Sequence, residues 1–141
     1  MKPLIGSVLF IIMVFLSGIH IYWGFGGKWG SAATIPTKGN NVPLIKPGFF
    51  DCLVVAIGLL SFGFFILIKA GIVVFGLPGW LSDYGLWVIS AIFLLRAIGE
   101  FNYVGFFKKV KSTRFGVMDT KYYSPLCLLL AILGIILGLI N

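Results

Sequence analysis

Three ionisable residues, His20, Arg96 and Glu100, lie within long apolar runs of this sequence. A charged side chain inside a membrane-spanning segment is costly, so each of them is a candidate functional residue. Arg96 and Glu100 are four residues apart, which places both on one face of a helix and allows an intrahelical ion pair. An imidazole, a guanidinium and a carboxylate in apolar surroundings could transfer protons, and Arg96 could bind an anionic headgroup.

Further polar residues lie where the same apolar runs begin or end, and we expect them to gather at one membrane face. The full set of candidates for ligand binding or acid–base chemistry is His20, Tyr22, Arg96, Glu100, Asn102, Tyr103, Asp119 and Tyr123. If these residues surround a space, they form a polar cavity that faces the cytoplasm. If they only satisfy one another's hydrogen bonds, they fix the packing of the helices and bind nothing.

Four apolar segments must position these residues. The chain is 60% hydrophobic and 11% charged, whereas a soluble domain carries about 25% charged residues. A membrane-spanning helix needs about 20 apolar residues, and the segments at about 3–25, 49–70, 83–107 and 124–141 meet this need. Asp83 suits the first turn of the third segment and Pro125 that of the fourth. We therefore predict an all-α fold, a single four-helix transmembrane bundle over residues 1–141 with antiparallel neighbours.

The basic residues predict how this bundle is oriented. Four spans put both termini on one side, together with Lys2 and Lys69, while the loops at about 26–48 and 108–123 hold eight basic residues. Short loops rich in Lys and Arg stay in the cytoplasm, so we expect both loops inside the cell and both termini on the non-cytoplasmic side. This distribution accounts for the net charge of +7 without a nucleic-acid partner.

Small residues form a stripe on the fourth segment, at Ala131, Gly134 and Gly138. Such stripes let helices approach closely, so we expect either close packing within the chain or a homodimer through this face. Cys52 and Cys127 belong to no CxxC pair and no Cys/His cluster, so we expect no metal site. With a single histidine, the chain cannot supply a two-histidine haem site, and we expect no cofactor.

Three segments carry a resemblance to a known family: residues 20–30 (HIYWGFGGKWG), 96–109 (RAIGEFNYVGFFKK) and 119–127 (DTKYYSPLC). They resemble a family of small bacterial membrane proteins catalogued as domain-of-unknown-function family 3995. The resemblance implies a four-span protein of the bacterial inner membrane and no assigned activity.

Three functions fit these observations, and the sequence leaves catalytic activity open. The first is a protein that binds a membrane lipid or another amphiphile in the cytoplasm-facing cavity. The second is a dimeric, proton-coupled transporter subunit with Glu100 as the coupling carboxylate. The third is an accessory or structural membrane protein without a ligand, docking a partner through the basic segment 108–121.

Overall fold

The computed structural model describes residues 1–40 and 42–141, and its long elements are all helices. The helices long and apolar enough to cross a membrane are α1 (Lys2–Gly24), α3 (Phe49–Lys69), α4 (Gly79–Ile98) and a continuous helix over Arg114–Leu139. The last consists of α5 (Arg114–Met118), a π-helical turn η1 (Asp119–Tyr123) and α6 (Ser124–Leu139). A single turn, α2 (Ser31–Thr34), lies in the first loop, and the described residues contain no β-strand. The predicted all-helical fold with four candidate spans is confirmed.

The helices pack mainly as two pairs, α1 with α3 and α4 with α6. In the first pair, the buried Ser17 hydroxyl donates a hydrogen bond to the Ala56 carbonyl oxygen at 2.9 Å. In the second pair, Gly134 lies directly against Ser90, so closely that a Cβ at Gly134 would overlap the serine Oγ. Close approach of this kind is what small residues provide in membrane helices, where packing replaces the hydrophobic drive.

The small-residue stripe of the fourth segment serves this packing inside the chain. Ala131 is fully buried, Gly134 faces Ser90, and a Cβ at Gly138 would meet the Trp87 ring at 3.4 Å. Packing within the chain is therefore observed, and a homodimer through the same stripe stays a prediction.

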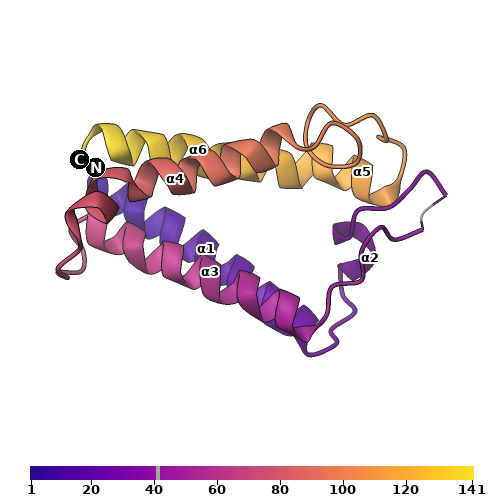
Figure 1. The fold of residues 1–141 in the computed structure, drawn as a ribbon, viewed down its shortest axis with the longest axis horizontal. Helices are drawn as coiled ribbons and strands as arrows, with labels where there is room; N and C mark the ends of the chain where they lie inside the picture. The colour runs from indigo at the N-terminus through magenta and orange to yellow at the C-terminus, as the bar shows by residue number, and fades with distance from the viewer. Residues whose placement is uncertain (41) are drawn as a thin grey trace.

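The two helix pairs share one core only toward the end of the molecule that holds both termini, which we call the terminus end (Figure 1). At the opposite end, the loop end, the pairs diverge. Residues 25–48, the first loop, and residues 99–113, the second loop, connect the helices there. The buried members of the shared core are Leu9, Met13, Leu59, Phe65, Ile66, Ala70, Leu86, Ile89, Phe93, Leu130, Ala131 and Leu137.

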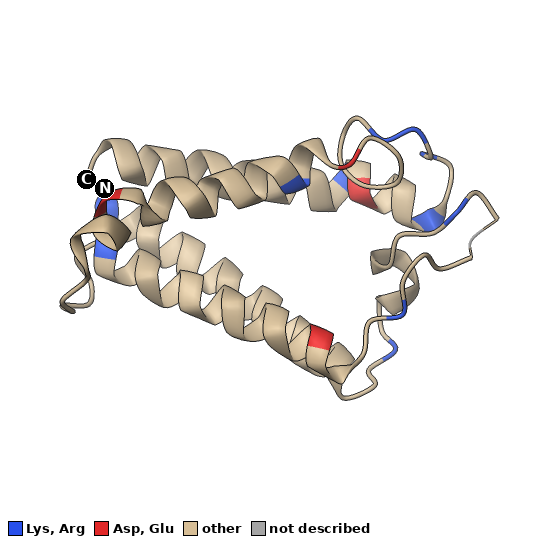
Figure 2. Cartoon of the chain, in the orientation of Figure 1, with Lys and Arg blue, Asp and Glu red and all other residues tan. Residues whose placement is uncertain are grey.

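The first loop folds across the loop end, where α2 packs near α5. Most of the lysines and arginines lie at this end (Figure 2). The Asp51 side chain accepts a hydrogen bond from the Gly48 N–H at 2.7 Å, which caps the start of α3 as the first loop ends.

Two predicted helix boundaries are wrong. The third span was expected over 83–107, but α4 covers Gly79–Ile98. It ends because Gly99 adopts a φ of 83° and a ψ of −171°, an extended conformation with positive φ that is open almost only to glycine and that turns the chain out of the helix. The predicted Arg96–Glu100 pair on one helix face therefore does not form.

The fourth span was expected over 124–141, starting at Pro125, but its helix begins at Arg114. Thr113 caps this start, because its side chain accepts the Gly116 N–H at 2.9 Å. A proline inside a helix clashes with the carbonyl four residues earlier. The wider turn η1 lies directly before α6, which has Pro125 in its first turn, so the helix continues through the proline.

Candidate functional site

Asp119 is the centre of a polar cluster at the loop end. It begins η1, and its side chain is completely buried. Its Oδ1 accepts a hydrogen bond from Arg96 Nη2 at 3.0 Å, and its Oδ2 accepts from the Gly105 N–H at 2.7 Å and Lys108 Nζ at 3.2 Å. A buried carboxylate needs such partners because desolvation without them is very costly. We call Arg96, Gly105, Lys108, Asp119 and Thr120 the Asp119 cluster.

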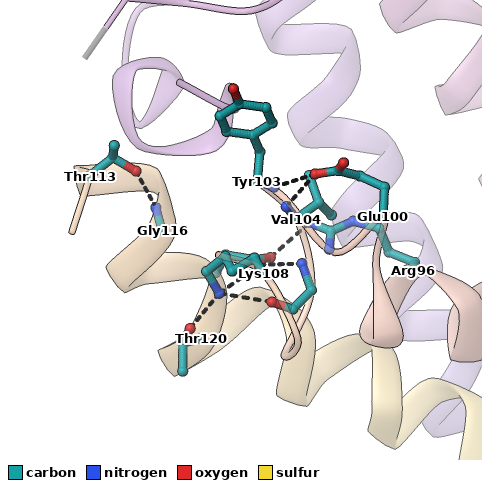
Figure 3. Close-up of polar contacts among 10 residues, drawn as sticks. Arg96, Glu100, Tyr103, Val104, Lys108, Thr113, Gly116 and Thr120 are labelled. Carbon is teal, nitrogen blue, oxygen red and sulfur yellow. Dashed lines mark hydrogen bonds and ion pairs between the residues drawn. The ribbon is translucent and has the colours of Figure 1, made fainter. Parts of the chain in front are cut away.

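Lys108 is sealed inside this cluster. Its side chain is 0% exposed, which is rare for lysine. Nζ donates to the Gly105 carbonyl oxygen at 2.9 Å, to Asp119 Oδ2, and to the Thr120 hydroxyl (Figure 3). An ammonium group has three donors, so every hydrogen bond that Lys108 can make is used. Its role in this position is to neutralise Asp119 and hold the second loop.

The second loop reaches Asp119 because its backbone closes on itself. Gly99 and Gly105 have φ of 83° and 87° and lie so close that a Cβ on either would overlap the backbone of the other segment. The Phe106 N–H donates a hydrogen bond to the Ala97 carbonyl oxygen at 2.8 Å, so the part of the loop that turns back contacts the end of α4. This closure points the Gly105 N–H and Lys108 at the carboxylate.

Glu100 caps this loop. Its Oε1 accepts hydrogen bonds from the backbone N–H of Tyr103 and from that of Val104, the latter at 3.1 Å (Figure 3). The side chain is exposed, and among the described residues no cation lies within ion-pairing distance of it. The carboxylate is therefore engaged in loop structure, and the ion pair expected from Arg96 goes to Asp119.

Arg96 is the partly exposed cation of the Asp119 cluster. It lies in the last turn of α4, where a cation suits the negative end of the helix dipole. Its side chain is 34% exposed, against 0% for Asp119 and Lys108. Nη2 is held by Asp119, while Nη1 is buried with no hydrogen-bond partner among the described residues. Arg96 is thus a partly exposed cation held by Asp119, and its unpartnered Nη1 does not reach the surface.

The remaining predicted site residues lie around the cluster or on the other helix pair. Tyr103 and Asn102 are in the second loop, where the Asn102 carbonyl oxygen accepts the N–H groups of Lys109 and Val110 at 3.0 and 2.8 Å. The Tyr123 ring lies tilted against the ring of Phe115, with the centroids 6.0 Å apart.

His20 and Tyr22 lie on α1. The His20 ring packs edge-on against Trp23 with centroids 5.3 Å apart, and its Nδ1 lies 2.7 Å from the Leu16 carbonyl oxygen. The Tyr22 hydroxyl accepts the Trp29 N–H at 3.3 Å. The contacts of His20 lie within α1, and the Tyr22–Trp29 hydrogen bond joins the end of α1 to the first loop.

Sequence reasoning missed Lys108, Thr120 and Gly105 as members of the site. The sequence places Lys108 only among the basic residues of a loop, and lysine is almost always exposed, so its type does not indicate a buried site. A signal was present, since Gly99 and Gly105 are six residues apart just after a span and before the Lys108-Lys109 pair. That spacing allows a closed loop, but it does not tell which of the two lysines turns inward.

An apolar groove of about 420 Å³ runs along α1 toward the loop end. It follows one face of the helix from Val14 past Gly18, where a Cβ would meet nothing within 4 Å, to Tyr22 and Trp29. Among the described residues, no cluster of His, Cys, Asp and Glu could hold a metal ion.

The helices and the buried ion cluster together define a small helical membrane protein. The chain belongs to the family described as "Protein of unknown function (DUF3995)", whose model matches residues 13–134. The matched region includes the entire Asp119 cluster, all of α3 and α4, about half of α1 and most of the last helix. No curated protein and no solved structure matches the chain.

Proposed function

We propose that this protein binds the headgroup of an anionic membrane lipid at Arg96, in the cytoplasmic leaflet of a bacterial inner membrane. The observation that carries the proposal is the unequal exposure within the Asp119 cluster. Two cations share one buried carboxylate, so Arg96, Lys108 and Asp119 together carry one net positive charge. Lys108 is sealed, and Arg96 alone reaches the surface.

The position of Arg96 favours an anion over another ligand class. Glu100, the nearest acidic residue along the chain, gives its carboxylate to the N–H groups of Tyr103 and Val104. Asp119 fixes the guanidinium from one side, which lowers the entropy lost when a headgroup binds. Arginine is suited to phosphate because its planar fork can donate two parallel hydrogen bonds.

The charge distribution supports the orientation in this proposal. Of the eight basic residues at the loop end, Lys108 is buried, which leaves seven with exposed side chains, against Lys2 and Lys69 at the terminus end. An excess of Lys and Arg marks the cytoplasmic side. Such residues also attract the anionic lipids of that leaflet, by about 1 kcal/mol each near the surface. The exposed ones are Lys28, Lys38, Lys46, Lys109, Lys111, Arg114 and Lys121.

The apolar groove on α1 is a shallow, open surface suited to a lipid chain, and it is lined by residues of α1 and the first loop and by none of the Asp119 cluster. Its apolar walls suit an acyl chain, and the aromatic residues Tyr22 and Trp29 lie at its loop-end limit. Tyrosine and tryptophan favour the headgroup level of a bilayer. The groove therefore follows the direction that a lipid chain takes from the cytoplasmic surface into the membrane.

Lipid retention tests the proposal. The protein is placed in nanodiscs containing equal amounts of phosphatidylglycerol and phosphatidylcholine, extracted in mild detergent, and its bound lipids are counted by native mass spectrometry. We expect the wild type to retain phosphatidylglycerol preferentially and Arg96→Gln to lose this preference. The matched control is Arg114→Gln. It removes an exposed arginine that makes no ion pair among the described residues.

Because Arg96 is one-third exposed, we expect Arg96→Gln to stay folded, which circular dichroism and gel filtration check. Equal retention of phosphatidylglycerol by folded Arg96→Gln and Arg114→Gln would refute the proposal.

A further inference from the structure

A second hollow, of about 360 Å³, lies at the terminus end, far along the helices from the Asp119 cluster. It is bounded by the first turn of α1, the end of α3, the loop that follows α3, and the start of α4. The lining includes Lys2, Lys69, Gly71, Phe75, Ser82 and Asn141. This hollow brings together Lys2 and Lys69, the two lysines that the described residues place at this end, where an acidic residue also lies (Figure 2).

Both lysines are half-buried, and their surroundings hold them in place. Lys69 Nζ donates a hydrogen bond to Ser82 Oγ at 3.1 Å. The carbonyl oxygen of Lys69 accepts the Asn141 amide at 2.8 Å, which fixes the end of α3 beside the end of the last helix. One of the three donors of the Lys69 ammonium group is engaged by Ser82, so two are left.

The hollow is lined by two lysines and by no Asp or Glu, while Asp83, the residue after Ser82 in α4, is the acidic residue next to it in the chain. Among the described residues, neither lysine forms an ion pair with a carboxylate. The helices α1 and α4 both begin at this end, and neither has a side-chain cap. Of these two helix starts, only Lys2 and Ser82 line the hollow, and the Ser82 N–H already donates to the Pro78 carbonyl oxygen at 3.0 Å, so the lysine side chains are the donors that an anion would meet.

We infer that the terminus end carries a phosphate-binding site, in which Lys69 and Lys2 hold a phosphoryl group. The phosphoryl group belongs either to a phospholipid headgroup of the leaflet at this end or to a free phosphate compound. A volume of about 360 Å³ accommodates a phosphate with a small substituent, and Ser82 and Asn141 add neutral hydrogen-bonding groups. The site is separate from Arg96 and does not depend on the function proposed there.

Binding of inorganic pyrophosphate and of dioleoylphosphatidic acid tests this site. Pyrophosphate is titrated against the full-length protein in an uncharged detergent by isothermal calorimetry. In the second arm, the protein is placed in nanodiscs of phosphatidylcholine with a tenth of phosphatidic acid and then extracted. The phosphatidic acid that stays bound to it is measured. The variants are Lys69→Gln and Lys2→Gln, with Lys46→Gln, an exposed lysine of the first loop, as the matched control. Lys69→Arg keeps the positive charge. Normal binding by this variant shows that a loss in Lys69→Gln comes from the missing charge and not from a changed end of α3.

We expect at least one probe to bind equally well to the wild type, Lys46→Gln and Lys69→Arg. Its affinity for Lys69→Gln should be about tenfold lower, a loss of about 1.4 kcal/mol in binding free energy. Dependence on Lys69 for pyrophosphate identifies a free phosphate site, and dependence for phosphatidic acid alone identifies a headgroup site. Equal binding by Lys69→Gln and Lys46→Gln overturns the inference, as does failure of the wild type to bind either probe. Arg96→Gln is expected to bind pyrophosphate as the wild type does. For phosphatidic acid, Lys69→Gln is also compared in the Arg96→Gln background, which keeps lipid held at the loop end out of this test.

Discussion

The substitution Asp119→Asn isolates the energetic role of the buried ion cluster. It preserves the size of the side chain and one carbonyl oxygen, but it leaves Lys108 buried without its counter-ion. Both side chains of this pair are 0% exposed, and their charged atoms lie 3.2 Å apart. Breaking a buried ion pair by removing one partner costs about 3–5 kcal/mol, because the remaining charge stays desolvated.

The ion pair between Asp119 and Arg96 contributes less to the free energy of unfolding. At 34% exposure of the arginine, solvent screens the interaction, and exposed pairs contribute about 0–1 kcal/mol. We therefore expect Asp119→Asn to lower the free energy of unfolding by about 3–5 kcal/mol and Arg96→Gln by about 1 kcal/mol or less. The order of the two losses follows from burial alone.

Reversible unfolding in mixed micelles, followed by circular dichroism, measures these differences. Asp83→Asn is the matched control, because Asp83 is an exposed aspartate near the start of α4, and surface changes are usually within about 0.5 kcal/mol. The double variant Asp119→Leu with Lys108→Met removes both charges together. We expect it to be more stable than Asp119→Asn, since apolar replacement of a complete buried pair is often neutral. A loss for Asp119→Asn within 1 kcal/mol of that for Asp83→Asn would refute this reasoning.

Three further substitutions test the local packing. Gly99→Ala should disrupt the second loop and expose it to limited proteolysis, because its φ is 83° and a Cβ would overlap the Val104 carbonyl; protection equal to wild type would contradict this. Gly134→Ala should destabilise the α4–α6 pair by overlap with Ser90 Oγ, and Ser90→Gly in the same chain should restore the melting temperature. No recovery in the double variant would exclude that contact as the cause. Thr113→Ala should cost about 1 kcal/mol of unfolding free energy and fray α5, visible as faster amide exchange at Gly116, whereas unchanged exchange would show that the cap is dispensable.

The four long helices could be predicted because each is an apolar run long enough to cross a bilayer, a property that composition alone reveals. Their ends depend on single residues and were harder to predict. Gly99 ends α4 through its backbone conformation, which residue type permits but does not require. Pro125 looked like a helix start, but a π-helical turn directly before α6 lets the helix pass through it, and such a turn has no recognised sequence signature.

The candidate site was predicted in part. Arg96 and Asp119 both belonged to the expected set, and their pairing joins residues that are 23 positions apart. The sequence favoured Glu100 as the partner of Arg96, because a spacing of four residues is ideal within one helix. Once the helix ends at Ile98, that spacing loses its meaning. The inward turn of Lys108 depends on the closed loop between Gly99 and Gly105, which only tertiary structure defines.

The pairing of helices that are neighbours along the chain has a consequence for biosynthesis. The first pair, α1 with α3, is complete by Lys69, before most of the second pair has left the ribosome. Because domains and local units form in order of synthesis, the first pair can dock in the membrane while α4 is still entering it. The order of synthesis also matters for the buried charges. Lys108 emerges from the ribosome before Asp119, so this lysine stays in contact with water or headgroups until the fourth helix arrives and supplies its counter-ion. Insertion of that helix is then the step that draws the second loop down onto the bundle.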